Sequence, residues 1–122
     1  MSAAKKVLYI EDNDDSLELV RRAMLLGGYL FLGAADGRTG LALAQREHPD
    51  LILLDINLPD LDGSEVARSL RADFRSIPIL AVSADSGPDS QHKALDAGCN
   101  QYLVKPVDVS ELWQIVAAYL PD

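Results

Sequence analysis

The feature that most constrains the fold is an unbroken apolar run at residues 51–54, LILL, which is followed directly by Asp55. A short continuous apolar run between Pro49 and Pro59 is typical of a strand that is buried on both faces, as the central strands of parallel sheets are. Asp55 would then lie at the carboxyl end of that strand, where open α/β sheets hold their ligands. The run therefore predicts a parallel sheet with a carboxylate at its ligand-binding edge.

The chain alternates between short apolar runs typical of strands and segments in which apolar residues recur at helical spacing. Strands are predicted at residues 6–10, 29–34, 51–55, 77–82 and 101–104, and helices at about 14–26, 38–47, 64–72, 89–97 and 108–119. The helix at 89–97 has the fewest apolar anchors, so we expect it to be the least stable and the most mobile. Strict alternation with short connections predicts a parallel sheet with helices on both faces, because such crossovers are right-handed.

The composition fits one globular domain, predicted to span residues 1–122 with its core at about 6–119. A net charge of −8 argues against direct nucleic-acid binding, which needs a basic face. Cys99 is the one cysteine, so an internal disulfide is excluded. The sequence has neither an apolar run of transmembrane length nor the apolar core of a signal peptide, so we expect no membrane association and a cytoplasmic location.

Polar residues collect where the predicted strands end. Glu11 and Asp12 follow the first strand, Asp55 ends the third, Ser83 follows the fourth and Lys105 follows the fifth, whereas the second strand ends in nothing comparable. The flavodoxin-like strand order 2-1-3-4-5 brings these four strand ends together and leaves the second strand at the edge. We therefore expect an α/β fold of the flavodoxin-like, doubly wound class, with a five-stranded parallel sheet and five helices.

This set of side chains suits one kind of chemistry. Carboxylates that lie close together repel, so that either a pKa rises or a cation binds between them, and Mg²⁺ prefers such hard oxygen ligands. A carboxylate nucleophile with Mg²⁺, a lysine and a hydroxyl can accept a phosphoryl group on Asp55. Each residue alone also has a structural explanation as a turn former or a helix cap. Four other acids, Asp14, Asp15, Asp60 and Asp62, are interpreted as solvated surface.

These residues resemble those of the receiver domain of two-component response regulators, the family of the single-domain chemotaxis regulator. The resemblance extends from Val7 to about Tyr119 and is carried by the acidic pair Glu11-Asp12, by Asp55 in the run LILLDINLPDLDG, by Ser83-Ala84 and by Lys105-Pro106. It implies that Asp55 accepts a phosphoryl group from the phosphohistidine of a histidine kinase or phosphotransfer protein. It also implies that the chain is no enzyme on separate substrates, and that the Lys105-Pro106 peptide bond is cis.

The resemblance further implies the metal ligands. Mg²⁺ would be bound by Asp12, by Asp55 and by the backbone carbonyl of Asn57, with Glu11 acting through water. Glu11 stands where the family usually has Asp, and the extra methylene is compatible with a contact through water.

Other roles implied by the resemblance concern the phosphoryl group after transfer. Ser83 would hydrogen-bond to it and Lys105 would pair with it, while Asn57 and Asp85 would set its lifetime. Ser83 would move toward it and Tyr102 would turn inward, although Tyr102 is also explained as a half-buried strand aromatic. The surface of the fourth helix, fifth strand and fifth helix would report this state to a downstream partner that the sequence does not identify.

The resemblance implies docking surfaces as well. The kinase or phosphotransfer protein would dock against the first helix near Asp14, Leu17 and Arg21 and against the loop after Pro106. Trp113 either lies on the reporting surface or serves packing, and a phosphorylation-linked homodimer is left open.

Three alternatives remain to be compared with this interpretation. Aspartate-nucleophile phosphatases of the haloacid dehalogenase type have an Asp two residues after the nucleophile, where this chain has Asn57, and their acidic pair comes last in the chain. A flavodoxin would need a phosphate loop after the first strand, where the acidic residues 11–15 would repel phosphate. A pseudo-receiver, which binds partners without phosphorylation, is the remaining alternative. No output domain is expected, and whether the chain is a stand-alone receiver or part of a larger protein is left open.

Overall fold

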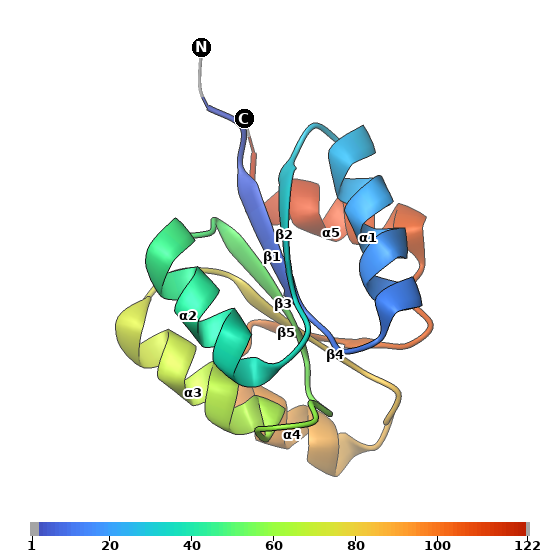
Figure 1. Cartoon of the computed structure of the whole chain (residues 1–122). Helices are drawn as coiled ribbons and strands as arrows, with labels where there is room; N and C mark the ends of the chain where they lie inside the picture. Colours follow the sequence, from blue (N-terminus) through green and yellow to red (C-terminus); the bar gives the residue numbers. More distant parts are fainter. Residues whose placement is uncertain (1–2, 122) are drawn as a thin grey trace.

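The computed structural model describes residues 3–121, and the predicted domain ends at 1–2 and 122 lie outside the described residues. Strands and helices alternate along the chain (Figure 1). The strands are β1 (Lys6–Ile10), β2 (Leu30–Ala34), β3 (Leu51–Asp55), β4 (Ile79–Ser83) and β5 (Gln101–Val104). The helices are α1 (Asp14–Leu26), α2 (Gly37–Glu47), α3 (Gly63–Asp73), α4 (Pro88–Asp96) and α5 (Val109–Tyr119).

The five strands form one parallel sheet in the order β2-β1-β3-β4-β5, which confirms the predicted topology. Helices α1 and α5 cover one face of the sheet, and α2, α3 and α4 cover the other (Figure 1). All residues of β3 are buried, as the LILL run predicts, and all residues of β4 are buried as well. The central position of β3 thus places Asp55 at the carboxyl edge of the sheet between β1 and β4.

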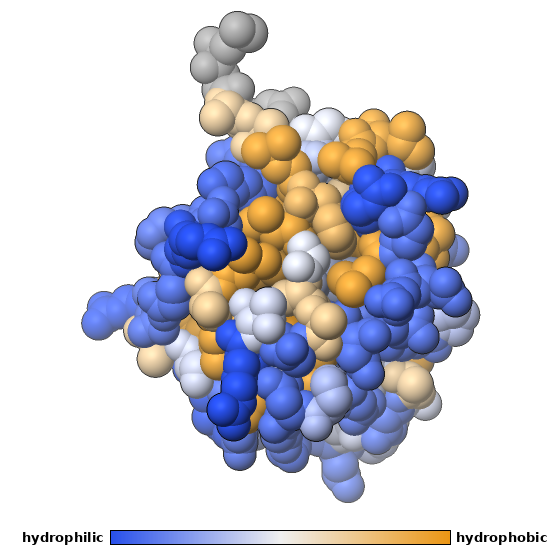
Figure 2. Space-filling view, viewed as in Figure 1, coloured by the Kyte–Doolittle hydropathy of each residue, from blue (hydrophilic) through white to orange (hydrophobic). Residues whose placement is uncertain are grey.

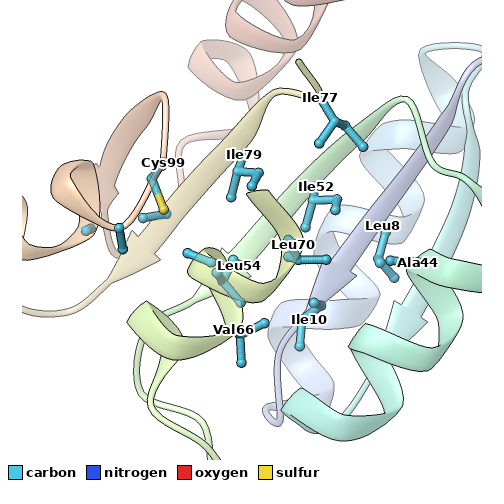
Figure 3. Packing of buried hydrophobic residues seen from close by; sticks show 14 of the residues in the cluster. Leu8, Ile10, Ala44, Ile52, Leu54, Val66, Leu70, Ile77, Ile79 and Cys99 are labelled. Carbon is cyan, nitrogen blue, oxygen red and sulfur yellow. The ribbon is translucent and has the colours of Figure 1, made fainter. Parts of the chain in front are cut away.

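Because successive strand side chains point to opposite faces, each strand supplies both halves of the core. On the α2, α3 and α4 side, Leu8, Ile52 and Ile79 from the strands meet Leu70 of α3 (Figure 3). On the α1 and α5 side the cluster includes Val7, Tyr9, Leu53 and Val82 from the strands, with Val20, Met24, Leu112 and Val116 from the helices. Two dry layers therefore hold the sheet and keep its carboxyl edge in a fixed geometry.

The predicted boundaries of two strands were wrong by one or two residues. β2 starts at Leu30 because the backbone N–H of Tyr29 bonds to Met24 O (3.0 Å), and so belongs to the turn that ends α1. In that turn Gly28 has a φ of +89°, which favours glycine. β4 starts after Pro78, whose ring nitrogen cannot donate to the sheet, and it extends to Ser83.

α4 is the helix with the weakest attachment, in agreement with its sequence. Ala94 is its one buried residue, and the cap residue Gly87 offers no side chain to the helix amides. Within residues 3–121 no helix combines the length and the hydropathy needed to cross a bilayer. Figure 2 shows apolar surface over β2 and the end of α1, where Leu30 and Leu26 are exposed, and hydrophilic surface on the outer side of the helices.

Candidate functional site

Three carboxylates meet at the carboxyl edge of the sheet. Glu11 follows β1, and its backbone N–H donates to Ala34 O (2.8 Å), so that the chain leaves the sheet in a fixed direction. Each of Glu11, Asp12 and Asp55 offers an oxygen that lies within 4.8 Å of the other two. Glu11 is 0% exposed and Asp55 is 3% exposed, whereas Asp12 is exposed to solvent. The predicted convergence of the first and third strand ends is therefore present.

Lys105 closes the site from the end of β5. Its Nζ lies 2.5 Å from Glu11 Oε1 and 3.2 Å from Asp55 Oδ2. The backbone N–H of Lys105 donates to Ser83 O (2.8 Å), which continues the pairing of β4 and β5 past the strand ends. The Lys105-Pro106 peptide bond is cis, as the resemblance implies. Lys105 thus bridges the two buried carboxylates.

The charges of this cluster are not balanced. Burial raises the pKa of Asp55, and the adjacent Glu11 raises it further. Burial would also raise the pKa of Glu11, but hydrogen bonds with Asp55, Lys105 and Tyr9 outweigh it and lower this pKa. Burial opposes the charge of Lys105, yet Glu11 and Asp55 together raise its pKa. One ammonium therefore faces three carboxylates, and two negative charges remain without a partner when all are ionised.

This donor set fits a divalent cation. Carboxylate oxygens are the ligands that Mg²⁺ prefers, and the exposed Asp12 leaves the cluster open to solvent on one side, as an ion that keeps several waters requires. A bound Mg²⁺ would also cancel the two unpaired negative charges. The residues present are thus suited to a magnesium site.

The loop after β3 orients the Asp55 side chain. The backbone N–H of Asn57 donates to Asp55 Oδ1 (2.9 Å), and the Asn57 side-chain amide lies 3.4 Å from Ser83 Oγ. The loop folds back on itself, since the N–H of Gly63 donates to Ile56 O (3.0 Å). A Cβ on Gly63 would lie 2.4 Å from Ile56 Cα, so this position has no room for a side chain. The loop therefore presents Asp55 and Asn57 in one geometry.

Ser83, Asp85 and Tyr102 form a second group beside the cluster. Ser83 is 1% exposed, and its Oγ accepts from the N–H of Asp85 (3.1 Å). The Asp85 carboxylate accepts from the N–H of Gly87 (2.8 Å) and from Ser90 Oγ (2.5 Å), so it is tied to the start of α4 and not hydrogen-bonded to Asp55. The half-buried Tyr102 donates its hydroxyl to the carbonyl of Asp85 (2.6 Å).

Tyr9 is a site residue that the sequence reasoning missed. The sequence pattern predicts it only as part of the strand at residues 6–10, but its hydroxyl donates to Glu11 Oε1 (2.9 Å) inside the core. Burial raises the pKa of Tyr9, and the charge of Glu11 adds to this effect, so the phenol remains a donor. The spacing could have indicated the contact, because residues two apart in a strand point to the same face.

The interpretation of Asp60 and Asp62 as plain surface was wrong in part. Asp60 reaches from the loop after β3 to the start of α2 and accepts from the N–H groups of Gly37 (2.8 Å) and Arg38 (3.0 Å). Asp62 caps α3 by accepting from the N–H of Ser64 (2.8 Å), and it also pairs with Lys93 of α4 (2.9 Å). Both acids thus fix the loop that carries Asn57.

The predicted docking residues of α1 lie on one side of the helix, and the predicted docking loop after Pro106 lies beside the other. Asp14, Leu17 and Arg21 line a hollow toward β2. The hollow between α1 and the loop after β5 has a volume of about 380 Å³ and is lined by Tyr9, Ser16, Leu19, Val20, Lys105, Pro106 and Val107. The two predicted parts of the docking surface, the Asp14, Leu17 and Arg21 face of α1 and the loop after Pro106, therefore border separate hollows, and the docking itself stays a prediction. Trp113 donates its Nε1–H to Ala23 O of α1 (2.7 Å), which supports the packing explanation.

Comparison with known proteins gives a consistent result. A sequence model of the family described as "Response regulator receiver domain" matches residues 7–117. The polar-differentiation response regulator DivK of Brucella ovis is 36% identical over 120 residues, which cover 97% of this chain and 98% of DivK.

Two solved structures show the same fold. The chemotaxis protein CheY4 of Vibrio cholerae has a TM-score of 0.91 at 30% identity, covering 97% of this chain and 100% of that one. The receiver domain of the sensor histidine kinase PA1611 of Pseudomonas aeruginosa has a TM-score of 0.88 at 34% identity, covering 96% and 98%, and holds a magnesium ion coordinated in its active-site cleft.

Proposed function

The chain belongs to the response regulator receiver domain family, and we propose that it is the Mg²⁺-dependent phosphoacceptor of a two-component phosphorelay, with Asp55 as the acceptor. The observation that carries the proposal is the placement of Asp55. Its carboxylate is buried at the carboxyl end of the central strand, Oδ1 accepts from Asn57 N–H, and Oδ2 faces Lys105. A carboxylate that serves only a turn or a cap would not need this surrounding of acids and a lysine.

Mg²⁺, when bound, would be held by Asp12, Asp55 and the Asn57 carbonyl, with Glu11 acting through water, and would neutralise the negative charge of the acids and of the incoming phosphoryl oxygens. The magnesium ion in the PA1611 receiver domain supports this assignment.

The transfer itself is a displacement at phosphorus. An Asp55 carboxylate oxygen attacks the phosphorus of a phosphohistidine, the phosphorus–nitrogen bond breaks, and its electron pair leaves with the imidazole of the donor. Lys105, which bridges Glu11 and Asp55 before the reaction, then pairs with a phosphoryl oxygen. The Ser83 hydroxyl turns from the N–H of Asp85 to donate to another. Orientation and charge compensation by these residues supply the catalysis.

Loss of the phosphoryl group reverses the activation. Water attacks phosphorus, the bond to the Asp55 oxygen breaks, and inorganic phosphate leaves. Asn57 and Asp85, each two residues after the end of β3 or β4, are assigned to this step. The chain thus catalyses its own phosphorylation and dephosphorylation and acts on no separate substrate.

The surfaces for two partners follow from the same proposal. The donor kinase or phosphotransfer protein covers the hollow beside Lys105 and Pro106, where Leu19 is an exposed apolar residue (47%). The downstream partner contacts α4, β5 and α5, where Leu95 (43%) and Val104 (41%) are exposed. A phosphorylated homodimer would use that same surface. We propose a cytoplasmic location as part of this function, because histidine kinases present their phosphohistidine there.

The experiment that tests the proposal is intact-mass measurement after incubation with acetyl phosphate, in Mg²⁺ and in chelator. We expect a gain of one phosphoryl group in Mg²⁺ only, and no gain for Asp55→Asn. The matched control is Asp89→Asn, which changes an exposed acid in the first turn of α4 and should behave as the wild type. No gain in the folded wild type under any condition would refute the proposal and favour the pseudo-receiver.

A further inference from the structure

We propose that Tyr9 is a positioning residue of this site, which holds the Glu11 carboxylate in place while Lys105 moves from Glu11 to the phosphoryl group. The inference rests on the proposed function and adds Tyr9 to the site, with a role separate from those of Glu11 and Lys105. Tyr9 would not touch the reacting atoms; it would act through Glu11.

The placement of Tyr9 supports this role. The residue is 0% exposed, and its ring belongs to the core cluster between the sheet and helices α1 and α5. Its hydroxyl nevertheless points to the carboxyl edge of the sheet and donates to Glu11 Oε1 at 2.9 Å. A ring fixed by core packing presents its hydroxyl with little freedom to move, so the hydrogen bond to Glu11 is preorganised.

The two carboxylate oxygens of Glu11 differ in the hydrogen bonds that they accept. Oε1 accepts from both Tyr9 and Lys105 (2.5 Å), whereas Oε2 accepts a long contact from the N–H of Asn13 (3.4 Å). When Lys105 turns to a phosphoryl oxygen, Oε1 keeps Tyr9 as its donor. Because Glu11 is 0% exposed, loss of both Tyr9 and Lys105 would leave Oε1 buried without either of its two strong donors, which is costly. Tyr9 therefore lowers the cost of moving Lys105.

The role is specific to a glutamate at this position. The side chain of Glu has one more rotatable bond than that of Asp, so its carboxylate has more orientations to choose from and gains more from a fixed donor. An Asp at position 11 would end one methylene earlier and would not reach the Tyr9 hydroxyl in the same way. Tyr9 and Glu11 should therefore act as a pair.

Removal of the hydroxyl has a predictable effect on the metal. Without Tyr9, Lys105 is the remaining strong donor to Oε1, so a cation must compete with Lys105 for a carboxylate that is less well oriented. Loss of a hydrogen bond to a metal-site residue costs about tenfold to a hundredfold in metal affinity. Since Glu11 is assigned a contact through water, we expect the lower value, a Mg²⁺ dissociation constant about tenfold higher in Tyr9→Phe.

The test is calorimetric titration of the full chain with Mg²⁺. The matched control is Tyr119→Phe, which removes a hydroxyl bonded to Gln101 (3.1 Å) and should bind Mg²⁺ as the wild type does. The decisive comparison is between Glu11→Asp and the double variant Glu11→Asp/Tyr9→Phe. Adding Tyr9→Phe to Glu11→Asp should cause no further change in Mg²⁺ affinity. A purely structural role of the hydroxyl would lower stability in both backgrounds without this coupling.

The outcomes distinguish failure of the Tyr9 role from failure of the phosphoacceptor assignment. Wild-type affinity in Tyr9→Phe, or an equal loss in the Glu11→Asp background, would overturn the role of Tyr9 and leave the phosphoacceptor assignment intact. No Mg²⁺ binding by the folded wild type would refute both. If Tyr9→Phe fails to fold, NMR of the wild type labelled at tyrosine Cζ decides, because the Tyr9 signal must shift as Mg²⁺ binds, and an unshifted signal would contradict the proposal.

Discussion

The two edges of the sheet differ in how their charges are balanced. At the carboxyl edge one ammonium, that of Lys105, faces the carboxylates of Glu11, Asp12 and Asp55, so negative charge is in excess. At the opposite edge, where β4 and β5 begin, Arg71 of α3 lies among carbonyl groups. Its acceptors are the carbonyl oxygens of Phe74, Arg75, Ile77 and Gly98 and Oδ1 of Asn100, at 2.7 to 3.2 Å.

The difference separates structure from function. The guanidinium of Arg71 has nearly all of its donors engaged, and it joins the loop after α3 to the turn after α4. Asn100 Oδ1 also accepts from the N–H of Ile79 (2.8 Å), so that the start of β4 depends on the same group. A satisfied polar centre of this kind stabilises the fold and has no capacity for a ligand. The unbalanced carboxyl edge has that capacity, and we expect it to lower stability until a cation binds.

The largest expected change in stability is at the edge where β4 and β5 begin, around Arg71. Arg71→Met keeps much of the side-chain volume but leaves several part-buried carbonyls without a donor, so we expect a loss of about 2–4 kcal/mol in the free energy of unfolding. Urea unfolding measures it. Because Arg71 is remote from the acids, phosphorylation by acetyl phosphate should persist wherever the variant is folded.

The control for this variant is Arg22→Met. Arg22 forms an exposed ion pair with Glu18 (2.9 Å), and such pairs contribute about 0.5 kcal/mol or less. If both variants lose the same small amount of free energy of unfolding, the hydrogen bonds of Arg71 do not stabilise the fold. The account of the edge where β4 and β5 begin would then be wrong.

The next change in the free energy of unfolding is smaller, and it is a gain where that of Arg71→Met is a loss. Asp55→Asn removes one of two adjacent buried carboxylates, and we expect a gain of about 1–2 kcal/mol in the free energy of unfolding at neutral pH without Mg²⁺. The same substitution should abolish phosphorylation. A loss of stability would mean that the bond between Lys105 and Asp55 outweighs the repulsion by Glu11.

The gain in stability of Asp55→Asn should depend on pH, and its direction follows from the raised pKa of Asp55. The pKa of Asp55 is raised from 3.8 to about 6 in the folded protein, so the folded state binds this proton more tightly than the unfolded state does. The penalty for ionising Asp55 is therefore complete above about pH 6 and disappears as the pH falls toward 3.8. The stability difference between Asp55→Asn and the wild type should shrink over that interval, as measured by urea unfolding at several pH values.

The sequence predicted the fold and much of the site because both depend on local signals. Alternating strand and helix patterns determined the topology, and strand ends marked by Glu11, Asp55, Ser83 and Lys105 identified which loops meet. Asn13 and Asp108, which precede α1 and α5, are residue types that favour helix caps, and each accepts from a helix amide. These features involve residues close in the chain or repeated at a regular period.

The parts that could not be predicted depend on contacts between distant segments. Asp60 caps α2 from 22 or more residues away, and Arg71 reaches Gly98 at a separation of 27. The direction of the Tyr9 hydroxyl depends on how the core packs around its ring, and the side of α1 that faces the β5 loop depends on helix rotation. Spacing places Tyr9 and Glu11 on the same face, but no propensity or spacing rule contains the position of the Tyr9 hydroxyl, the contacts of Asp60 and Arg71 or the rotation of α1, since these are set by tertiary packing.

The central claim is that the carboxyl edge is short of positive charge and that a divalent cation supplies it. The most direct test is the free energy of unfolding of the wild type, Asp55→Asn and Arg71→Met with and without Mg²⁺. At a Mg²⁺ concentration ten times the dissociation constant, binding should stabilise the wild type by about 1.4 kcal/mol. Arg71→Met should gain as much, because its acids are intact, and Asp55→Asn should gain far less. A wild type that Mg²⁺ does not stabilise, or an Asp55→Asn variant stabilised equally, would contradict the claim.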